Sequence, residues 1–275
     1  GGPACGGAIV KIRRMAGTVL LAVLVAVSFS GALFPRFSYA VQNREFTDAA
    51  PSLRFPLGTD DLGRDRFARL LYASRVSLLL ASAASLAALL VAALLGGIAG
   101  YWGGWCDRCL TRAIDLMLSL PWLFLLLAAR ALLPLNASPL TSLVVTYALL
   151  ALLGWASPAR VVRAGVRSFR DSEFVLQARS EGLGEFRILW RAVLPNLRPI
   201  LLAQFWTSIP VFILTEANLG FLGLSAGEPF PTWGSLLRDL QSPLLVRPEG
   251  FAPVAAIALS VCCFRLLSPK GRLQA

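Results

Sequence analysis

Six stretches of this chain are apolar and long enough to cross a lipid bilayer, and they limit what it can fold into. The first, residues 15–35, runs for 21 residues without a charge. At 1.5 Å per helical residue, this length crosses a hydrocarbon core about 30 Å thick. Only 15% of the 275 residues are charged, whereas a soluble domain carries about 25%. Because a spanning segment satisfies its backbone groups internally, we expect an all-α membrane protein.

The other five predicted spans follow after residue 75. They cover residues 76–101, 113–133, 140–157, 199–220 and 250–267. Two prolines lie inside them, Pro121 in the third span and Pro210 in the fifth, and each is expected to produce a kink or a hinge. Arg130, near the end of the third span, is expected to pair with a neighbouring group, with a place in a transport path as the alternative.

Basic residues before the first span indicate its orientation. Lys11, Arg13 and Arg14 precede it, which places the N-terminus in the cytoplasm and, with six spans, the C-terminus as well. The alternative is a secretory signal, but residues 15–35 exceed its usual core of about 7–15 residues, so a retained anchor is favoured. The predicted organisation is a cytoplasmic tail (1–14), a first helix (15–35), an external segment with a short entry helix (36–75), a five-helix core (76–268) and a cytoplasmic tail (269–275).

The composition excludes several kinds of catalytic site. The chain contains no histidine, so a Ser-His-Asp or Cys-His nucleophilic site and an imidazole metal site are ruled out. Cys106 and Cys109 have the spacing of a redox or zinc motif, but with no second pair the spacing is attributed to chance or packing. The net charge of +11 fits cytoplasmic loops beside lipid better than a nucleic-acid surface.

Residues 56–65 form the first of two organised polar segments. Gly58 and Gly63 permit turns, and Asp60 or Asp61 is expected to cap a short helix that leads into the membrane. A calcium site is the alternative, but the acidic residues do not have the spacing of an EF-hand loop. We therefore expect an entry loop without a metal.

Residues 160–198 form the second polar segment, which is predicted to lie on the cytoplasmic side. Asp171 or Ser172 can cap a helix with an apolar face, and residues 182–184 interrupt it. A second amphipathic stretch begins at Glu185 and is expected to stop at Pro195. Such a pair of helices either lies on lipid or contacts a protein, and the residues alone leave both alternatives open.

One motif consists of Leu176-Gln177-Ala178, then Gly182, then Leu194-Pro195. Together with three further segments, it resembles the motifs of permease subunits of bacterial ATP-binding cassette importers. The family signature EAA, three residues, G, nine residues, I-x-LP has its counterpart here, with departures at Leu176, Gln177 and Ala192. The remaining three motifs resemble the dipeptide, oligopeptide and nickel branch of the family. They are PLGTDDLGRDRFARLLYASRVS at 56–77, GYWGGWCDR at 100–108, and FLGL at 221–224 with PTWG at 231–234.

The resemblance implies a type I importer permease fold with a cytoplasmic coupling helix in the loop 171–196. Its implied partners are a second permease subunit, two cytoplasmic ATPases, an external solute-binding protein and membrane lipid, with no nucleic acid. The chain has no GxxxxGK[ST] loop, so ATP and Mg²⁺ are expected in the ATPases and no cofactor in this chain. The implied ATPase-coupling residues are Glu173, Phe174, Val175, Leu176, Gln177, Ala178, Arg179, Gly182, Leu183, Arg187 and Pro195. Among them, Phe174, Val175 and Leu183 are expected to enter an ATPase groove, with Arg179 and Arg187 pairing at its rim.

Glu216 and Asn218 in the fifth span are candidates for the translocation path or its gate. An acid in a membrane span must face a cavity or a partner, because its exposure to lipid is costly. A salt bridge or hydrogen bond from Glu216 to the second permease is the alternative. The predicted function is transport of a peptide or a related small solute through a bacterial inner membrane, without catalysis by this chain. Nickel or another non-peptide solute is the alternative cargo, and a membrane-embedded enzyme or receptor the alternative class.

Overall fold

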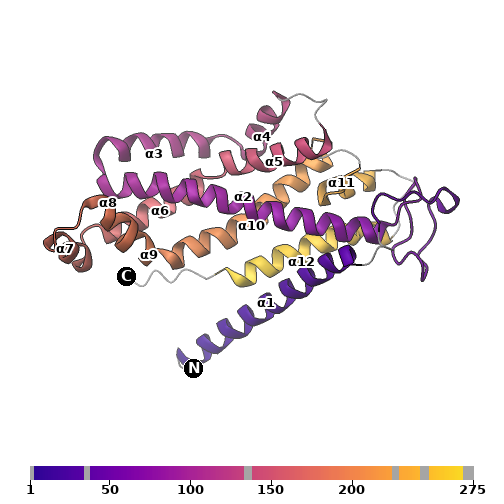
Figure 1. Cartoon of the computed structure of the whole chain (residues 1–275), viewed down its shortest axis with the longest axis horizontal. Helices are drawn as coiled ribbons and strands as arrows, with labels where there is room; N and C mark the ends of the chain where they lie inside the picture. The colour runs from indigo at the N-terminus through magenta and orange to yellow at the C-terminus, as the bar shows by residue number, and fades with distance from the viewer. Residues whose placement is uncertain (1–2, 34–37, 133–137, 225–228, 242–247, 269–275) are drawn as a thin grey trace. The chain divides into compact units, whose positions relative to one another are not determined.

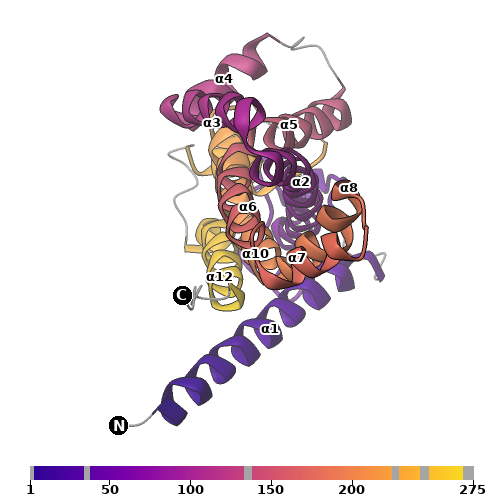
Figure 2. The same cartoon turned by 90° about the vertical axis from the view of Figure 1, so that its left-hand side faces the viewer.

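The regular elements among the described residues are helices (Figures 1 and 2). The computed structural model describes residues 3–33, 38–132, 138–224, 229–241 and 248–268, so the predicted tail 269–275 lies outside the described residues. Within them, five helices are long and apolar enough to cross a membrane, and one bent pair can supply a sixth span. The prediction of an all-α membrane protein is confirmed.

The chain divides into two compact units, which are described separately. The first comprises residues 1–82, 130–147 and 209–267, and the second comprises 83–129, 148–208 and 268–275. In the first unit, α1 (Pro3–Leu33) packs along α12 (Ala252–Leu267), as Figure 1 shows. The absence of a side chain at Gly17 permits this approach, because a Cβ there would lie 2.8 Å from the Cβ of Leu266.

The helix that follows the entry loop is α2 (Arg66–Trp102), whose 37 residues make it the longest described helix. Its N-terminus is capped by Asp65, whose Oδ1 accepts from the backbone N–H groups of Phe67 at 2.8 Å and Ala68 at 3.3 Å. The prediction of Asp60 or Asp61 as the cap is therefore wrong. Asp60 instead organises the preceding loop, where it binds Arg64 at 2.7 Å and also binds Arg69.

A short helix, α11 (Trp233–Arg238), packs against the end of α10 (Arg198–Phe221) within the first unit. Gly220 and Gly234 face one another so closely that a Cβ on Gly234 would lie 2.7 Å from the Cα of Gly220. Trp233 is fully buried, and its indole N–H donates to Ser74 Oγ at 3.0 Å. The described residues of this unit also include three short 3₁₀ segments: η1 (Arg44–Phe46), η3 (Asp239–Gln241) and η5 (Pro248–Phe251).

The third predicted span is broken sharply. It consists of α3 (Gly104–Ser119) and α4 (Trp122–Ala131), which are bent by 88° at the break. Pro121 lies in this break, and its missing N–H removes the hydrogen bond that would continue α3. Pro210, in contrast, lies inside α10, which continues through it.

The fourth predicted span extends further than expected. Residues 139–169 form one continuous candidate span, made of α5 (Pro139–Leu153) and α6 (Ala156–Phe169). Helical residues therefore occupy the first part of the predicted inner loop. In the second unit, α6 packs on α2 through Gly100, where a Cβ would lie 2.6 Å from the carbonyl oxygen of Arg163.

Four short helical pieces connect α6 to α10 in the second unit. They are α7 (Glu173–Ser180), α8 (Glu185–Ile188), the π-helical turn η2 (Leu189–Val193) and α9 (Leu194–Asn196). Helical residues run without a break from Glu185 to Asn196, and Leu197 lies in a turn. The second amphipathic stretch therefore ends one residue after Pro195, close to its predicted end. Figure 2 shows α7 and α8 side by side.

Candidate functional site

Residues 171–196, which we call the elbow, contain two short helices joined by a glycine turn. The turn is a Schellman motif, in which Gly182 N–H donates to Arg179 O at 2.9 Å and Leu183 N–H donates to Ala178 O at 3.1 Å. Gly182 has φ +75°, a conformation that L side chains rarely adopt. The predicted interruption of the helix at this glycine is confirmed.

The N-terminus of α7 follows Ser172, in agreement with one of the two predicted caps. The Ser172 side chain does not bind the helix N-terminus, because its Oγ donates to Phe169 O at 2.6 Å. Glu173 lies in the first turn, where a negative charge is favourable beside the positive end of the helix dipole.

The two faces of α7 have different environments. Val175 and Ala178 are buried in an apolar cluster of the second unit, to which α6, η2 and α9 also contribute. Phe174 and Leu183 are partly buried against the same cluster. The expectation that Val175 enters an ATPase groove is therefore not met in this structure, because its side chain is 0% exposed inside its own chain. The exposed positions on α7 are Glu173, Leu176, Gln177 and Ser180.

Arg179 pairs within the chain, whereas we expected it to pair with a partner. Its Nε donates to Glu185 Oε1 at 3.0 Å, across the glycine turn. The hydroxyl of Tyr101 donates to Glu185 Oε2. The hydrogen bond from Tyr101, followed by those from Arg179, lowers the pKa of the Glu185 carboxyl below its ordinary value of 4.5. Arg187, the second predicted rim residue, is exposed.

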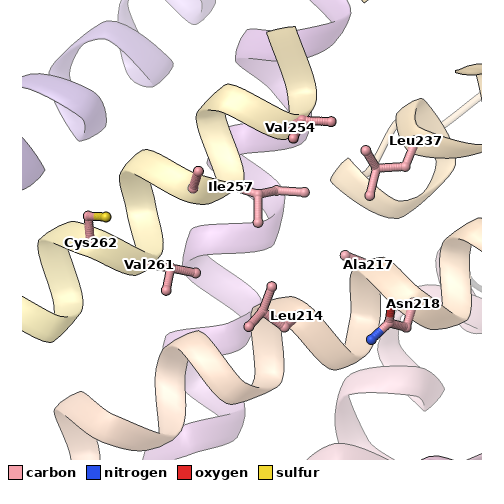
Figure 3. Close-up of a pocket in the computed structure, with 9 residues that line it drawn as sticks. Leu214, Ala217, Asn218, Leu237, Val254, Ile257, Val261 and Cys262 are labelled. Carbon is pink, nitrogen blue, oxygen red and sulfur yellow. The ribbon is translucent and has the colours of Figure 1, made fainter. Parts of the chain in front are cut away.

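The two candidate gate residues on α10 occupy different environments. Glu216 is 0% exposed, so its side chain belongs to the interior of the first unit. Asn218 is exposed and lines a pocket of about 460 Å³ between α10, α11 and α12 (Figure 3). The other lining residues are apolar apart from one cysteine: Leu214, Ala217, Leu237, Val254, Ile257, Ala258, Val261 and Cys262.

Arg130 has the structural pairing that the sequence analysis favoured. It is 4% exposed, and its guanidinium donates to Leu224 O at 3.0 Å and to Ser142 Oγ at 2.7 Å. These contacts join the end of α4 to α5 and to the loop after α10 within the first unit. A structural role for Arg130 therefore accounts for a cation inside a predicted span.

Two polar contacts of the second unit were not predicted from the sequence. One is the contact of Tyr101 and Glu185, which lie 84 residues apart. The other is an ion pair in which Arg163 Nη2 donates to Asp107 Oδ2 at 2.7 Å, joining α6 to α3. The aromatic segment that contains Tyr101 was interpreted as a membrane-interface belt, and no local spacing rule indicates these partners.

The described residues offer little for a metal. Cys106 and Cys109 are exposed free thiols. Across the part of the chain that is described, no group of three or more Cys, Asp or Glu side chains is arranged to hold an ion.

A broken third span, five continuous spans and an exposed elbow define a multi-pass membrane subunit. Residues 92–268 match the family described as the binding-protein-dependent transport system inner membrane component. The chain belongs to this family, and it is a membrane permease component of an ATP-binding cassette importer, a component that is not itself catalytic. Such components work with ATPase and binding-protein partners in general.

Relatives with established names agree with this assignment. The chain is 29% identical over 254 residues to the oligopeptide transport system permease protein OppC of Bacillus subtilis, covering 92% of this chain and 81% of the relative. It is 34% identical over 223 residues to the dipeptide transport system permease protein DppC of Alkalihalophilus pseudofirmus, covering 81% and 71%. It is 31% identical over 255 residues to the glutathione transport system permease protein GsiD of Pectobacterium atrosepticum, covering 92% and 83%.

Proposed function

We propose that this chain forms half of the translocation path of a peptide importer and that its elbow receives the motion of a cytoplasmic ATPase. The second half is a second permease subunit, and two ATPases bind the ATP and Mg²⁺. An external binding protein delivers the solute. Both chain termini lie in the cytoplasm in this arrangement, which agrees with the basic residues before the first span.

The exposed face of α7 is the observation that carries the proposal. Its inner face is fixed to the apolar cluster of the second unit, while Leu176 is 53% exposed beside Gln177 and Glu173. A leucine on an exposed polar helix is suited to fill a pocket on a partner protein. The inner face then transmits any displacement of α7 to the helices that form the cluster.

Replacement of the exposed leucine tests this contact without altering the core. We expect Leu176→Arg to reduce the amount of ATPase that co-purifies with the assembled importer, because a charge would enter an apolar contact. Leu53→Arg is the matched control, since Leu53 is 103% exposed in the external segment. Equal ATPase recovery with the two variants would exclude α7 as the contact.

We assign peptides of a few residues as the cargo, because the relatives are named for oligopeptides, dipeptides and glutathione. Competition for uptake between labelled dipeptide and Ni²⁺ tests the assignment. Excess unlabelled dipeptide should reduce uptake of the labelled dipeptide, and excess Ni²⁺ should leave this uptake unchanged. The reverse pattern would contradict a peptide cargo.

We further propose that the pocket beside Asn218 lies on the translocation path, while the buried Glu216 supports α10 from inside the subunit. Cys262 is an exposed thiol in the same pocket and provides a native probe. A membrane-impermeant thiol reagent added outside should label Cys262 during turnover, and the label should be absent in Cys262→Ser. Labelling by lipid-soluble reagents alone would place the pocket against lipid instead.

A further inference from the structure

The glycine turn of the elbow does not by itself fix the angle between α7 and α8. A Cβ placed on Gly182 or Gly184 would meet nothing within 4 Å, so steric contact with neighbouring atoms does not restrict the backbone of these two residues. Glycine also has the widest conformational freedom of any residue. The apolar cluster holds one face of α7 and of α8, and a force applied to α7 would still rotate the turn about that face unless further contacts hold it.

One such contact is the ion pair that spans the turn. Arg179 at the end of α7 donates from Nε to Glu185 Oε1 at 3.0 Å and from Nη2 to Glu185 Oε2 at 3.4 Å. The two side chains are 32% and 48% exposed. An isolated pair with this exposure contributes little, because water and salt screen it.

Tyr101 adds a buried anchor to this exposed pair. Its side chain is 2% exposed in the apolar cluster of the second unit, and its hydroxyl donates to Glu185. The guanidinium of Arg179 lies 5.9 Å from the centre of the Tyr101 ring, within the range of a cation–π contact. Arg179 and Glu185 therefore both contact the Tyr101 side chain of α2.

The end of α2 that carries Tyr101 is itself held by its neighbours in the second unit. Gly100 brings the α2 backbone against Arg163 of α6, and Arg163 is paired with Asp107 of α3. A displacement that reaches Tyr101 consequently reaches α2, α6 and α3 together, because a packed core transmits strain.

We propose that Tyr101, Glu185 and Arg179 form a clamp that makes the elbow and the end of α2 move as one body. The three are positioning residues: they touch neither ATP nor solute, and they prevent the glycine turn from absorbing the motion of α7. The inference rests on the proposed function, since it assigns the route by which ATPase motion enters the membrane spans.

Tyr101→Phe is the principal test, because it removes the hydroxyl and keeps the ring in the cluster. In the assembled importer reconstituted in vesicles, we expect the solute transported per ATP hydrolysed to fall about ten-fold, the lower end of the scale for one lost hydrogen bond to a charged group. The recovery of ATPases and the maximal ATPase rate should stay at the wild-type level. An unchanged transport-to-ATPase ratio would overturn the clamp.

A double-mutant cycle with Glu185→Gln separates a clamp from two independent effects. Because both substitutions break the same unit, the double variant should lose no more coupling than the more severe single variant. Additive losses would show that the residues act separately and would also overturn the proposal. Asp115→Asn is the matched control, since Asp115 forms an exposed ion pair with Arg160 at 2.6 Å outside the elbow. It should leave the ratio unchanged.

The same measurements distinguish failure of the clamp from failure of the proposed function. If wild-type protein recovers no ATPase, the coupling role of the elbow fails and the clamp fails with it. If Tyr101→Phe recovers ATPase and transports at the wild-type ratio, the elbow remains the contact and only the clamp is lost.

Discussion

Alanine at Gly182 should disturb the elbow through its backbone alone. A Cβ at this position meets nothing within 4 Å, and only the φ of +75° opposes a side chain. Moving a non-glycine residue into this left-handed region costs about 1–2 kcal/mol. This corresponds to a loss of about 5- to 30-fold in the population of the native turn.

Gly184 provides a control on the same turn. It is equally open, but its φ of −65° and ψ of 144° suit any residue. Gly184→Ala should therefore change stability by less than about 0.5 kcal/mol, because its reduced freedom in the unfolded chain offsets a weaker helix cap. The two alanines differ only in the backbone conformation that they must adopt.

Hydrogen exchange at the amide of Leu183 is the direct assay, because this amide donates to Ala178 O only when the turn is formed. Gly182→Ala should exchange about 5- to 30-fold faster than wild type, and Gly184→Ala should match wild type. Equal protection in the two variants would refute the backbone explanation. Gly182→Val, which adds a β-branched side chain at positive φ, should abolish transport while the subunit remains in the membrane.

Three further outcomes are expected. Asp60→Asn removes the carboxylate that the buried Arg69 and Arg64 share, leaving Arg69 the more distant Asp239 at 4.0 Å, and should cost about 3 kcal/mol, measured as a lower thermal midpoint in detergent. Ser74→Ala removes the acceptor of the Trp233 indole and should cost about 1–3 kcal/mol, with a shifted tryptophan emission. The ionised Glu185 carboxylate stabilises the folded elbow fully above its pKa in the unfolded chain, and this stabilisation is lost as pH falls through its lower pKa in the folded protein. The protection of the elbow's amides against hydrogen exchange should therefore stay constant from about pH 8 to 5 and decline only below pH 4.5.

The membrane spans could be predicted because their signal is local. The length and apolar character of a span are visible in its consecutive residues. Gly182 likewise ends a helix because of the left-handed backbone conformation of the turn itself. The two prolines show the limit of such rules. Pro121 lies in an 88° break and Pro210 lies within a continuous helix, because the surroundings that can compensate a missing N–H come from distant parts of the chain.

The candidate site could be predicted only in part for the same reason. Helical spacing correctly placed Val175 on an apolar face, but spacing cannot say whether that face is covered by its own chain or by a partner. The structure covers it with the chain's own cluster. Likewise, Asp60 and Asp65 are both plausible caps by residue type, and only the positions of the backbone N–H groups select Asp65.

The break between α3 and α4 should affect the stability of this subunit in cells when it is not assembled with its partners. The break leaves helix ends inside a candidate span, and in a bilayer the backbone polar groups of such ends would lack water. Ser119 satisfies one of these groups by donating to Leu116 O at 2.8 Å. Phe124, just beyond the break, is 68% exposed. A copy synthesised without companions would present both features to lipid, and we therefore expect cells to degrade orphaned chains and to balance their synthesis with that of the other subunits.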